Sequence, residues 1–309
     1  MWKVALVLVL TLIIVPLGCF YFDEPLSLIQ KTTLIKLLYV YGAFALLAFL
    51  VSTVTDNYSQ VDKLWSIMPI AYVWIVAVES HFAPRILLMA ILVTIWGLRL
   101  TFNFARRGGY SIKVWEGEED YRWSILRKRP GFTSAWKWTL FNFFFISAYQ
   151  MALILLMTLP IVKSMDSDLS LTVFDYLLAL LILILIAIEW LADQQQYDFQ
   201  TKKYQQINEG QELSNPYKTG FVHTGLWAYM RHPNYMAEQG IWILFYFFSV
   251  IATGGWINWS IAGAILLIFL FKGSSDFSEE ITAEKYPEYA RYQKEVGRFL
   301  PIGKKYTAQ

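Results

Sequence analysis

Ionisable and amide side chains interrupt the long apolar stretches of this sequence at a few positions. They are Asp62, Arg99, Asn103, Glu189, Asp193, Asn234 and Glu238. Apart from Asp62, they form pairs four residues apart, so the two members of each pair share one helix face. Charged groups within apolar helices are costly and suggest a functional site by default. Anchoring at helix ends explains any one of them, but it explains the set poorly, because Glu189 and Glu238 stand several residues inside apolar sequence.

The composition indicates which elements carry these residues. Hydrophobic residues make up 56% of the 309 residues, charged residues make up 16%, and the mean hydropathy is +0.41. Soluble domains are about half apolar and about a quarter charged, so a soluble fold has too few interior positions for this much apolar surface. Aromatic residues reach 17%, and Trp and Tyr gather at membrane interfaces. The sequence therefore predicts an all-α, multi-pass transmembrane helical bundle.

A membrane-spanning helix needs roughly 20 apolar residues. Eight stretches meet this requirement, at about 2–22, 33–54, 62–79, 84–104, 137–161, 171–192, 235–253 and 256–274. Two glycines at 254 and 255 predict a tight hairpin between the last two stretches. The first stretch also fits a cleaved signal peptide, because Lys3 precedes it. It has no clear cleavage site, so we expect a retained helix.

The distribution of basic residues predicts the orientation, because Lys and Arg are enriched in cytoplasmic loops. The loops 105–136 and 193–234 and the C-terminal tail carry most of the Lys and Arg residues, and the opposite loops carry few. Eight spans with both termini in the cytoplasm satisfy this distribution. On this topology the polar helix faces all reach the cytoplasmic side, where we expect them to converge on a pocket.

The cytoplasmic loops combine basic and aromatic side chains, among them Arg107, Tyr121, Arg122 and Lys202. Such a surface suits a phosphorylated cofactor, whose charge meets Arg and Lys and whose rings meet aromatic faces. Anionic lipid head groups would attract the same loops and are the alternative interpretation.

The segment 225–238 has the most specific pattern and reads Gly-Leu-Trp-Ala-Tyr-Met-Arg-His-Pro-Asn-Tyr-Met-Ala-Glu. Its proline suits the first turn of a helix, where the missing N–H costs no hydrogen bond. In this position Arg231 could clamp a phosphate, and Asn234 and Glu238 could bind an amide or a ribose. A basic-aromatic membrane anchor is the simpler interpretation, which the ordered residues disfavour. The cofactor-binding residues expected here are Arg231, His232, Asn234, Tyr235 and Glu238.

Other chemistries have little support in the sequence. Cys19 is the single cysteine, so we expect neither an internal disulfide nor a cysteine-based metal site. The three histidines are distributed over both predicted membrane faces, so no histidine metal site is expected. The sequence has no GxGxxG, GxxxxGK[ST] or GxSxG motif. Its net charge of +2 does not indicate nucleic-acid binding.

The chain resembles the steroid 5-alpha-reductase-like group of multi-pass enzymes, and most of all its uncharacterised bacterial branch. The resemblance rests on Arg-His-Pro-Asn-Tyr-x-x-Glu at 231–238, Gly-Leu-Trp at 225–227 and Lys-Tyr-Pro-Glu-Tyr-x-x-Tyr at 285–292. Trp-Gly-Leu-Arg at 96–99, Gly-Glu-Glu-Asp-Tyr-Arg-Trp at 117–123 and Ala-Asp at 192–193 match as well. It covers roughly residues 35–305.

This resemblance implies a bundle that holds NADPH from the cytoplasmic side and reduces a carbon–carbon double bond conjugated to a carbonyl. An acid would hydrogen-bond the carbonyl oxygen and stabilise the developing enolate. By position, Asn234 and Glu238 match the pair that contacts nicotinamide and ribose. Asp193 matches a cofactor-contacting acid, and Arg99 matches an arginine at the end of a cytoplasm-facing helix. Counting back from that arginine without a gap places the catalytic glutamate at Asp62.

The sequence departs from that group at several positions. Asp62 is one methylene shorter than glutamate, and Val61 stands where a glutamine usually precedes it. The carbonyl-binding tyrosine falls on Trp96, whose indole N–H donates a hydrogen bond but is no acidic hydroxyl. The C-terminal His and Tyr of the steroid enzymes are replaced around residues 274–279. Cofactor binding is therefore expected to transfer better than the substrate or the catalytic acid.

The chain also resembles the isoprenylcysteine carboxyl methyltransferases, which share the bundle and an Arg-His-Pro-x-Tyr motif but bind S-adenosylmethionine. Those enzymes usually have a glycine soon after the tyrosine, where this chain has Met-Ala-Glu at 236–238. Asn234 together with Glu238 favours the reductase. A non-catalytic lipid-binding membrane protein is a third possibility.

We therefore expect residues 1–32 to form an N-terminal helix and linker, and residues 33–309 to form the catalytic domain of an NADPH-dependent reductase. Its substrate would be a lipophilic enone from the bilayer, of a steroid-like or isoprenoid-like kind, and its other partners would be membrane lipids. The expected location is a bacterial inner membrane, with the site facing the cytoplasm. Asp62 and Trp96 are the expected catalytic residues. Besides those of segment 225–238, the expected cofactor-binding residues are Arg99, Asn103, Arg107, Tyr121, Arg122, Glu189, Asp193 and Lys202.

Overall fold

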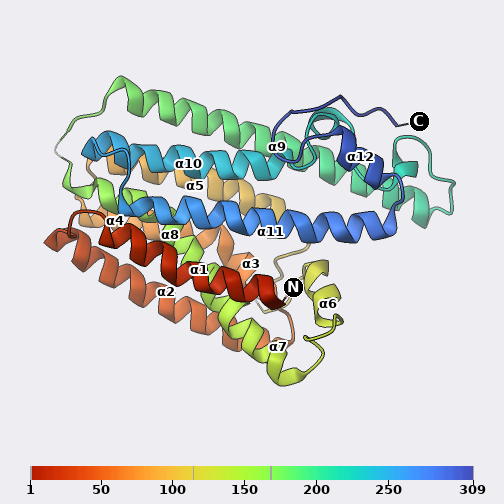
Figure 1. Cartoon of the computed structure of the whole chain (residues 1–309), viewed down its shortest axis with the longest axis horizontal. Coiled ribbons are helices and arrows are strands. Elements are labelled where there is room, and N and C mark those ends of the chain that lie inside the picture. The colour runs from red at the N-terminus through yellow and green to blue at the C-terminus, as the bar shows by residue number, and fades with distance from the viewer. Residues whose placement is uncertain (1, 114, 168, 309) are drawn as a thin grey trace. The chain divides into compact units, whose positions relative to one another are not determined.

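A computed structural model describes residues 2–113, 115–167 and 169–308, and these residues form helices and connecting loops without a named strand (Figure 1). Seven of the described helical stretches are long and apolar enough to span a membrane. They are Leu28–Thr55, Gln60–Glu79, Pro84–Ala105, Ala135–Asp166, Val173–Asn208, Pro233–Thr253 and Trp259–Lys285. A shorter apolar helical stretch, Ala5–Tyr21, precedes them. The expected all-α, multi-pass architecture is confirmed, and the seven long helices together with the shorter stretch agree with about eight spans.

The helices divide into two compact units. Unit 1 contains Met1–Leu181 and Trp242–Phe269, and unit 2 contains Ile182–Ile241 and Leu270–Gln309. Three long helices, α9 (Val173–Asn208), α10 (Pro233–Thr253) and α11 (Ala262–Lys285), contribute residues to both units. The expected division of roles at residue 32 stays a prediction.

Unit 1 contains most of the apolar spans. Besides parts of α9, α10 and α11, its elements are α1 (Trp2–Tyr21), α2 (Leu28–Thr55), α3 (Gln60–Trp65), α4 (Ile67–Glu79), α5 (Pro84–Ala105), α6 (Tyr121–Arg127), α7 (Ala135–Phe141), the π-helix η1 (Asn142–Tyr149), α8 (Gln150–Lys163), and the short 3₁₀ helices η2 (Ser164–Asp166) and η5 (Trp259–Ile261). A capping box between Ser27 and Gln30 begins α2, and Pro84 occupies the first turn of α5. The predicted span 62–79 is divided at Ser66 into α3 and α4.

The fifth predicted span has an irregular start. Where the sequence predicts one helix over 137–161, the structure has α7, the π-helix η1 and then α8. Asn142 at the start of η1 is fully buried, and its Nδ2 donates to Ser52 Oγ at 2.9 Å and to Thr53 Oγ1 at 3.1 Å in α2. Such interhelical hydrogen bonds stabilise helix packing in membranes.

A buried ion pair closes unit 1 at the start of α9. Arg85 in α5 donates from Nε to Asp175 Oδ1 at 2.8 Å and from NH2 to Asp175 Oδ2 at 3.1 Å. The same guanidinium reaches the carbonyls of Leu169 and Ser170, so it also holds the loop before α9. Both side chains are buried, at 3% and 0% exposure. We call Arg85 with Asp175 the Arg85 clasp.

Unit 2 contains the more polar elements. Besides parts of α9, α10 and α11, it has the 3₁₀ helices η3 (Tyr217–Thr219) and η4 (Gly225–Ala228) and the helix α12 (Tyr289–Glu295). The sequence predicts that a loop starts at residue 193, but α9 continues to Asn208, and likewise α11 continues to Lys285. These predictions were wrong because the apolar run ends before the helix does, while Gln, Lys and Glu still favour helix. Phe221, Tyr289, Tyr292, Val296 and Tyr306 form a hydrophobic core in this unit.

Candidate functional site

The Arg-His-Pro-Asn-Tyr motif leads into α10 within unit 2. Its proline is the first residue of the helix, as the sequence predicts. Asn234 follows in the first turn, and its Nδ2 donates to Asp193 Oδ1 in α9 at 3.1 Å. The Oδ1 of Asn234 accepts from the backbone N–H of Tyr235 at 3.0 Å, which fixes the orientation of the amide. Two of the polar faces predicted from the sequence, one on α9 and one on α10, are thus joined by a hydrogen bond.

Three carboxylates belong to these same two helix faces. Glu189 stands one turn before Asp193 in α9, and Glu238 stands one turn after Asn234 in α10. All three acids are buried, at 4–5% exposure. Burying a carboxylate costs several kcal/mol unless hydrogen bonds or charges compensate it. Such a concentration of acceptors in an apolar protein suits a ligand rich in hydroxyl and amide donors.

Arg231 is engaged by its own chain. Its Nε donates to Glu279 Oε1 in α11 at 2.7 Å, and its NH2 donates to Oε2 at 3.3 Å. Its NH1 donates to the carbonyl of Gln293 at 2.9 Å and to the carbonyl of Val296. A phosphate would have to compete with these bonds for the guanidinium. The role of Arg231 in cofactor binding stays a prediction, and the geometry gives it a structural role.

His232 shares the same carboxylate. Its Nε2 lies 2.8 Å from Glu279 Oε1, and its ring is stacked on that of Tyr235, with the centroids 5.1 Å apart. Burial lowers the pKa of His232 below its ordinary value, although the charge and hydrogen bond of Glu279 act in the opposite direction. The ring is therefore mainly neutral at pH 7 and donates its Nε2–H, because a carboxylate can only accept.

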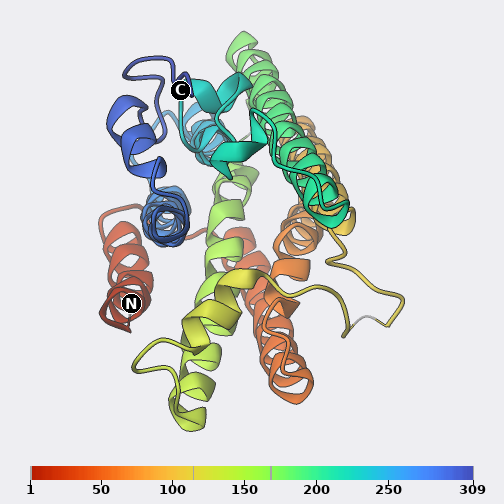
Figure 2. The same ribbon diagram turned by 90° about the vertical axis from the view of Figure 1, so that its right-hand side faces the viewer.

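The C-terminal segment binds the loop that precedes α10. The backbone N–H groups of Arg231 and His232 donate to the carbonyls of Gly297 and Arg298 at 2.9 and 3.0 Å. Further along, Tyr306 N–H donates to Ala228 O at 2.9 Å. Figure 2 shows this segment, in dark blue near the C-terminus, beside the teal loop of the same unit. Tyr292 of the tail motif at 285–292 also donates from its hydroxyl group to the carbonyl of Trp227, so this motif is in direct contact with the motif at 225–238.

Two neighbouring lysines of α9 have different surroundings. Lys202, a predicted cofactor-binding residue, is exposed. Lys203 is buried, and its Nζ donates to the carbonyl of Gly220 at 3.0 Å and lies 4.9 Å from the centroid of the Tyr204 ring. Lys203 therefore holds the 209–224 loop on α9, whereas the charged group of Lys202 is exposed at the protein surface.

Asp62, the predicted catalytic acid, lies in α3 of unit 1. It is half-buried, and its Oδ2 accepts from the indole Nε1 of Trp123 in α6 at 3.3 Å. Trp123 is the last residue of the Gly-Glu-Glu-Asp-Tyr-Arg-Trp motif. Trp123, which has no predicted role of its own, thus orients the predicted acid.

The loop that carries this motif is hydrogen-bonded to the start of α3. The backbone N–H of Asp120 donates to Ser59 Oγ at 2.9 Å, and Tyr58 N–H donates to Glu119 Oε1 at 2.7 Å. Gln60 Nε2 donates to the carbonyl of Trp115 at 2.9 Å. These bonds set the position of α6, and hence of Trp123 against Asp62.

The predicted cofactor residues of α5 are buried. Arg99 and Asn103 are 5% and 8% exposed. Asn103 Oδ1 accepts from Arg106 through both Nε, at 3.0 Å, and NH2, at 2.7 Å. The amide oxygen of Asn103 is therefore engaged by a neighbouring residue of the same chain segment.

The other predicted cofactor residues of unit 1 follow α5, with Arg107 in the loop and Tyr121 and Arg122 at the start of α6. Arg107 and Tyr121 are exposed, and Arg122 is half-buried. Arg122 donates from NH2 to Asp120 Oδ2 at 2.7 Å. Burial favours a higher pKa for the Asp120 carboxyl, but the charges of Arg122 and Arg107 and the hydrogen bonds from Arg122 outweigh it and lower that pKa. Asp120 is therefore ionised at neutral pH and balances the basic loop.

Trp96, the second predicted catalytic residue, is packed in the interior of unit 1. It is 1% exposed, and its ring meets Trp242 edge to face, with centroids 4.9 Å apart. Aromatic pairs of this geometry stabilise beyond the area that they bury. The position thus has a clear packing role, and its catalytic role stays a prediction.

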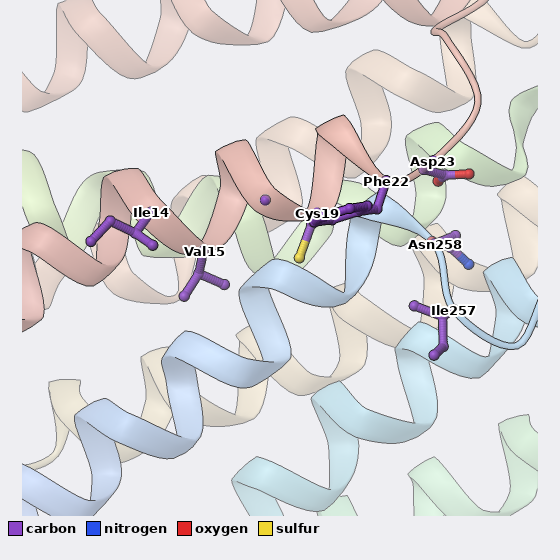
Figure 3. Close-up of a pocket in the computed structure, with 8 residues that line it drawn as sticks. Ile14, Val15, Cys19, Phe22, Asp23, Ile257 and Asn258 are labelled. Carbon is purple, nitrogen blue, oxygen red and sulfur yellow. The ribbon is translucent and has the colours of Figure 1, made fainter.

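A cavity of about 280 Å³ lies elsewhere in unit 1 (Figure 3). Its lining consists of Ile14, Val15, Gly18, Cys19, Phe22, Asp23, Ile257 and Asn258, so it contains none of the predicted site residues. Asp23 is paired with Lys163 at 2.9 Å and accepts from Trp259 N–H at 2.7 Å. The carboxylate of Asp23 at this cavity thus has its hydrogen-bond partners within the protein.

Comparisons with known proteins match the part of the chain that contains these motifs. A family model described as "Protein of unknown function (DUF1295)" matches residues 48–296. "Uncharacterized protein C594.04c" of Schizosaccharomyces pombe is 35% identical over 269 residues, which cover 81% of this chain and 74% of that protein. No solved structure matches. The match includes the Asp62 region, both buried acid faces and α12, and the chain belongs to the DUF1295 family of proteins of unknown function.

Proposed function

We propose that this protein is a membrane-embedded, NADPH-dependent reductase that acts on a carbon–carbon double bond conjugated to a carbonyl in a lipophilic substrate. The observation that carries the proposal is the hydrogen bond between the half-buried Asn234 and the buried Asp193, flanked by the buried Glu189 and Glu238 in the same unit. The proposed location is a membrane, with the nucleotide reached from the cytoplasmic side. The resemblance of the motifs to the steroid 5-alpha-reductase-like enzymes suggests the reaction.

The donor and acceptor groups of unit 2 fit the proposed cofactor. The nicotinamide amide and the ribose hydroxyls are hydrogen-bond donors, and Asp193, Asn234 and Glu238 provide acceptors within two adjoining helix faces. NADPH would supply the hydride when bound. Because Arg231 is engaged by Glu279 and two carbonyls, we assign phosphate binding within unit 2 to the exposed Lys202 rather than to Arg231.

Asp62 is the proposed acid. Trp123 donates to one oxygen of its carboxyl group, so the other oxygen would hold the proton that bonds the substrate carbonyl. A hydrogen bond to the oxygen that gains charge stabilises the enolate-like transition state. Trp96 is the second proposed catalytic residue, and it would hydrogen-bond the substrate carbonyl through its indole N–H.

The small molecule retained by the detergent-purified protein tests the cofactor. We expect mass spectrometry to find NADPH or NADP⁺ in the wild-type protein and much less in Glu238→Gln. Retained S-adenosylmethionine, or its demethylated product, would contradict the reductase and support a methyltransferase. Retention of lipid alone, with no response to either nucleotide, would support a non-catalytic lipid-binding protein.

Turnover tests the acid separately. In Asp62→Asn we expect unchanged NADPH affinity and a loss of about 10²- to 10⁴-fold in NADPH oxidation by a lipophilic enone, the usual effect of a positioned acid. Full activity of this variant would show that the acid lies elsewhere. Trp123→Phe keeps Asp62, keeps an aromatic ring at position 123 and removes the N–H bonded to Asp62, so as a control it should lose less.

A further inference from the structure

Glu279 is a buried carboxylate for which the sequence predicts no role. It stands in the part of α11 that belongs to unit 2 and is 2% exposed. Its Oε1 accepts from Arg231 and from His232, at 2.7 and 2.8 Å. Its Oε2 accepts from Gln293 at 2.9 Å and from Arg298 at 3.2 Å. One carboxylate therefore ties three separate stretches of the chain together.

Each of these stretches has a distinct place in unit 2. Arg231 and His232 form the entry to α10, Gln293 lies in α12, and Arg298 lies in the segment after it. Arg231 also donates to the carbonyls of Gln293 and Val296, and the backbone N–H groups of residues 231 and 232 donate to residues 297 and 298. The α10 entry is thus held by the side-chain bonds of Arg231 and His232 to Glu279 and, separately, by bonds to backbone carbonyls of residues 293–298.

The α10 entry in turn sets the direction of the residues that follow it. The ring of His232 stacks on Tyr235 at an interplanar angle of 13°, and Tyr235 contacts Phe271 of α11 with ring centroids 4.6 Å apart. In the sequence, Asn234 lies between His232 and Tyr235, whose rings are stacked, and Asn234 donates to Asp193. A shift of His232 would therefore move Asn234 relative to α9.

The surroundings of Glu279 suit a residue that holds several chain segments together better than they suit an acid that binds a ligand. Two arginines, a histidine and an amide surround one carboxylate, so both of its oxygens are occupied by donors of the protein. Charge-assisted bonds of this kind are stronger and more directional than neutral bonds. A site for ligands needs side chains held in place by such supporting contacts.

We infer that Glu279 is a positioning residue that holds the α10 entry through Arg231 and His232 and thereby keeps Asn234 on Asp193. The inference concerns the site of the proposed function and rests on it only for the identity of the ligand. It also assigns Arg231 to the support of the site.

Hydrogen–deuterium exchange of the ligand-free protein tests the positioning directly. The variant Glu279→Gln keeps the size of the side chain and removes its charge, and Glu280→Gln, at the exposed neighbouring position, is the matched control. We expect faster exchange in a peptide covering residues 228–238 for Glu279→Gln alone, with the other membrane helices unchanged. Equal exchange in the two variants, or faster exchange throughout the protein, would overturn the inference.

The coupling of Glu279 to Asn234 supplies a second readout. Glu279→Gln should weaken NADPH binding by about tenfold in the wild-type background and have almost no further effect in Asn234→Ala, because residues that act as one unit are not additive. Equal losses in both backgrounds would overturn the inference. If the wild-type protein binds no NADPH, the proposed function fails, and the exchange comparison still decides the role of Glu279. Should Glu279→Gln not fold, Glu279→Asp is expected to show the same local change to a smaller degree.

Discussion

Two buried arginines of this protein make nearly the same contacts in different surroundings. Arg85 in unit 1 is bidentate to Asp175, and Arg231 in unit 2 is bidentate to Glu279. Each guanidinium also donates to two backbone carbonyls, so each holds a loop as well as a carboxylate. We call Arg231 with Glu279 the Arg231 clasp.

The two clasps differ in what their carboxylates and sequence neighbours do. Asp175 also accepts from Thr172, one turn away, and the Arg85 clasp is followed along α5 by apolar residues. Glu279 is shared with His232 of the motif itself, which leads to Asn234 and Glu238. Burial of a charge alone therefore does not distinguish a purely structural ion pair from one that supports a ligand site. The polar residues that lie next to the ion pair along the chain do distinguish the two.

The largest effect is expected from breaking the Arg85 clasp. Arg85→Met leaves Asp175 buried without its arginine, which should lower the free energy of unfolding by about 3–5 kcal/mol. Nucleotide affinity should be unchanged in the fraction that folds. Reversible unfolding in mixed detergent measures the first quantity, and titration with NADPH measures the second.

A double variant serves as the control for that prediction. Adding Asp175→Asn to Arg85→Met removes the uncompensated charge, so part of the stability should return. A loss of nucleotide affinity in Arg85→Met would show that the two clasps are alike in function.

The opposite outcome is expected at Glu238. Glu238→Gln should weaken NADPH binding by about 10- to 100-fold, because a hydrogen bond to a charged group contributes about 1.5–3 kcal/mol. Its thermal unfolding midpoint should change little, since Gln fills the same volume. If Glu238→Gln binds NADPH with wild-type affinity and is less stable, Glu238 does not belong to the site and has a purely structural role.

Conservative substitution of both arginines compares the clasps under one chemical change. Lysine keeps the charge and loses the bidentate geometry. We expect Arg85→Lys and Arg231→Lys to lose similar stability, roughly 1–2 kcal/mol each, and only Arg231→Lys to weaken NADPH binding, by a few-fold. If both variants bind NADPH like the wild type, the Arg231 clasp does not position the site.

The smallest effect concerns pH. Because burial lowers the pKa of His232 in the folded protein, the unfolded chain binds a proton more readily. The resulting stability is present at neutral pH and is lost as the pH falls from about 6.5, the ordinary value for histidine, through the folded pKa.

His232→Gln should lack this part of the pH dependence, whereas Arg85→Met should keep it. His223, whose pKa burial also lowers, would supply the remaining part. Unfolding midpoints measured between pH 7 and pH 5 test this, and an identical pH dependence in wild type and His232→Gln would contradict it.

The spans could be predicted from the sequence to within a few residues at most ends, because long apolar runs report membrane helices directly. The break at Ser66 and the π-helix beginning at Asn142 could not, because no local pattern marks them, although Ser66 contacts Thr101 of α5 and Asn142 bonds Ser52 of α2. The end of α9 was missed because its last turns are polar and still helical.

Parts of the candidate site were also visible in the sequence. The four-residue spacing placed Asp193 and Asn234 on polar faces, and the structure joins these faces by a hydrogen bond. The partner of Arg231 was not predictable, because Glu279 lies 48 residues away and no local pattern links them. Trp123 was similarly missed, since its contact with Asp62 spans 61 residues.

The central claim is that the acid and amide faces of α9 and α10 bind NADPH. Titration of nucleotide-stripped protein with NADPH and with S-adenosylmethionine, in wild type, Glu238→Gln and Arg85→Met, tests it most directly. We predict saturable NADPH binding in wild type and in folded Arg85→Met, a loss of about 10- to 100-fold in Glu238→Gln, and no saturable binding of S-adenosylmethionine. Binding of S-adenosylmethionine in place of NADPH, or NADPH binding that is indifferent to Glu238→Gln, would contradict the claim.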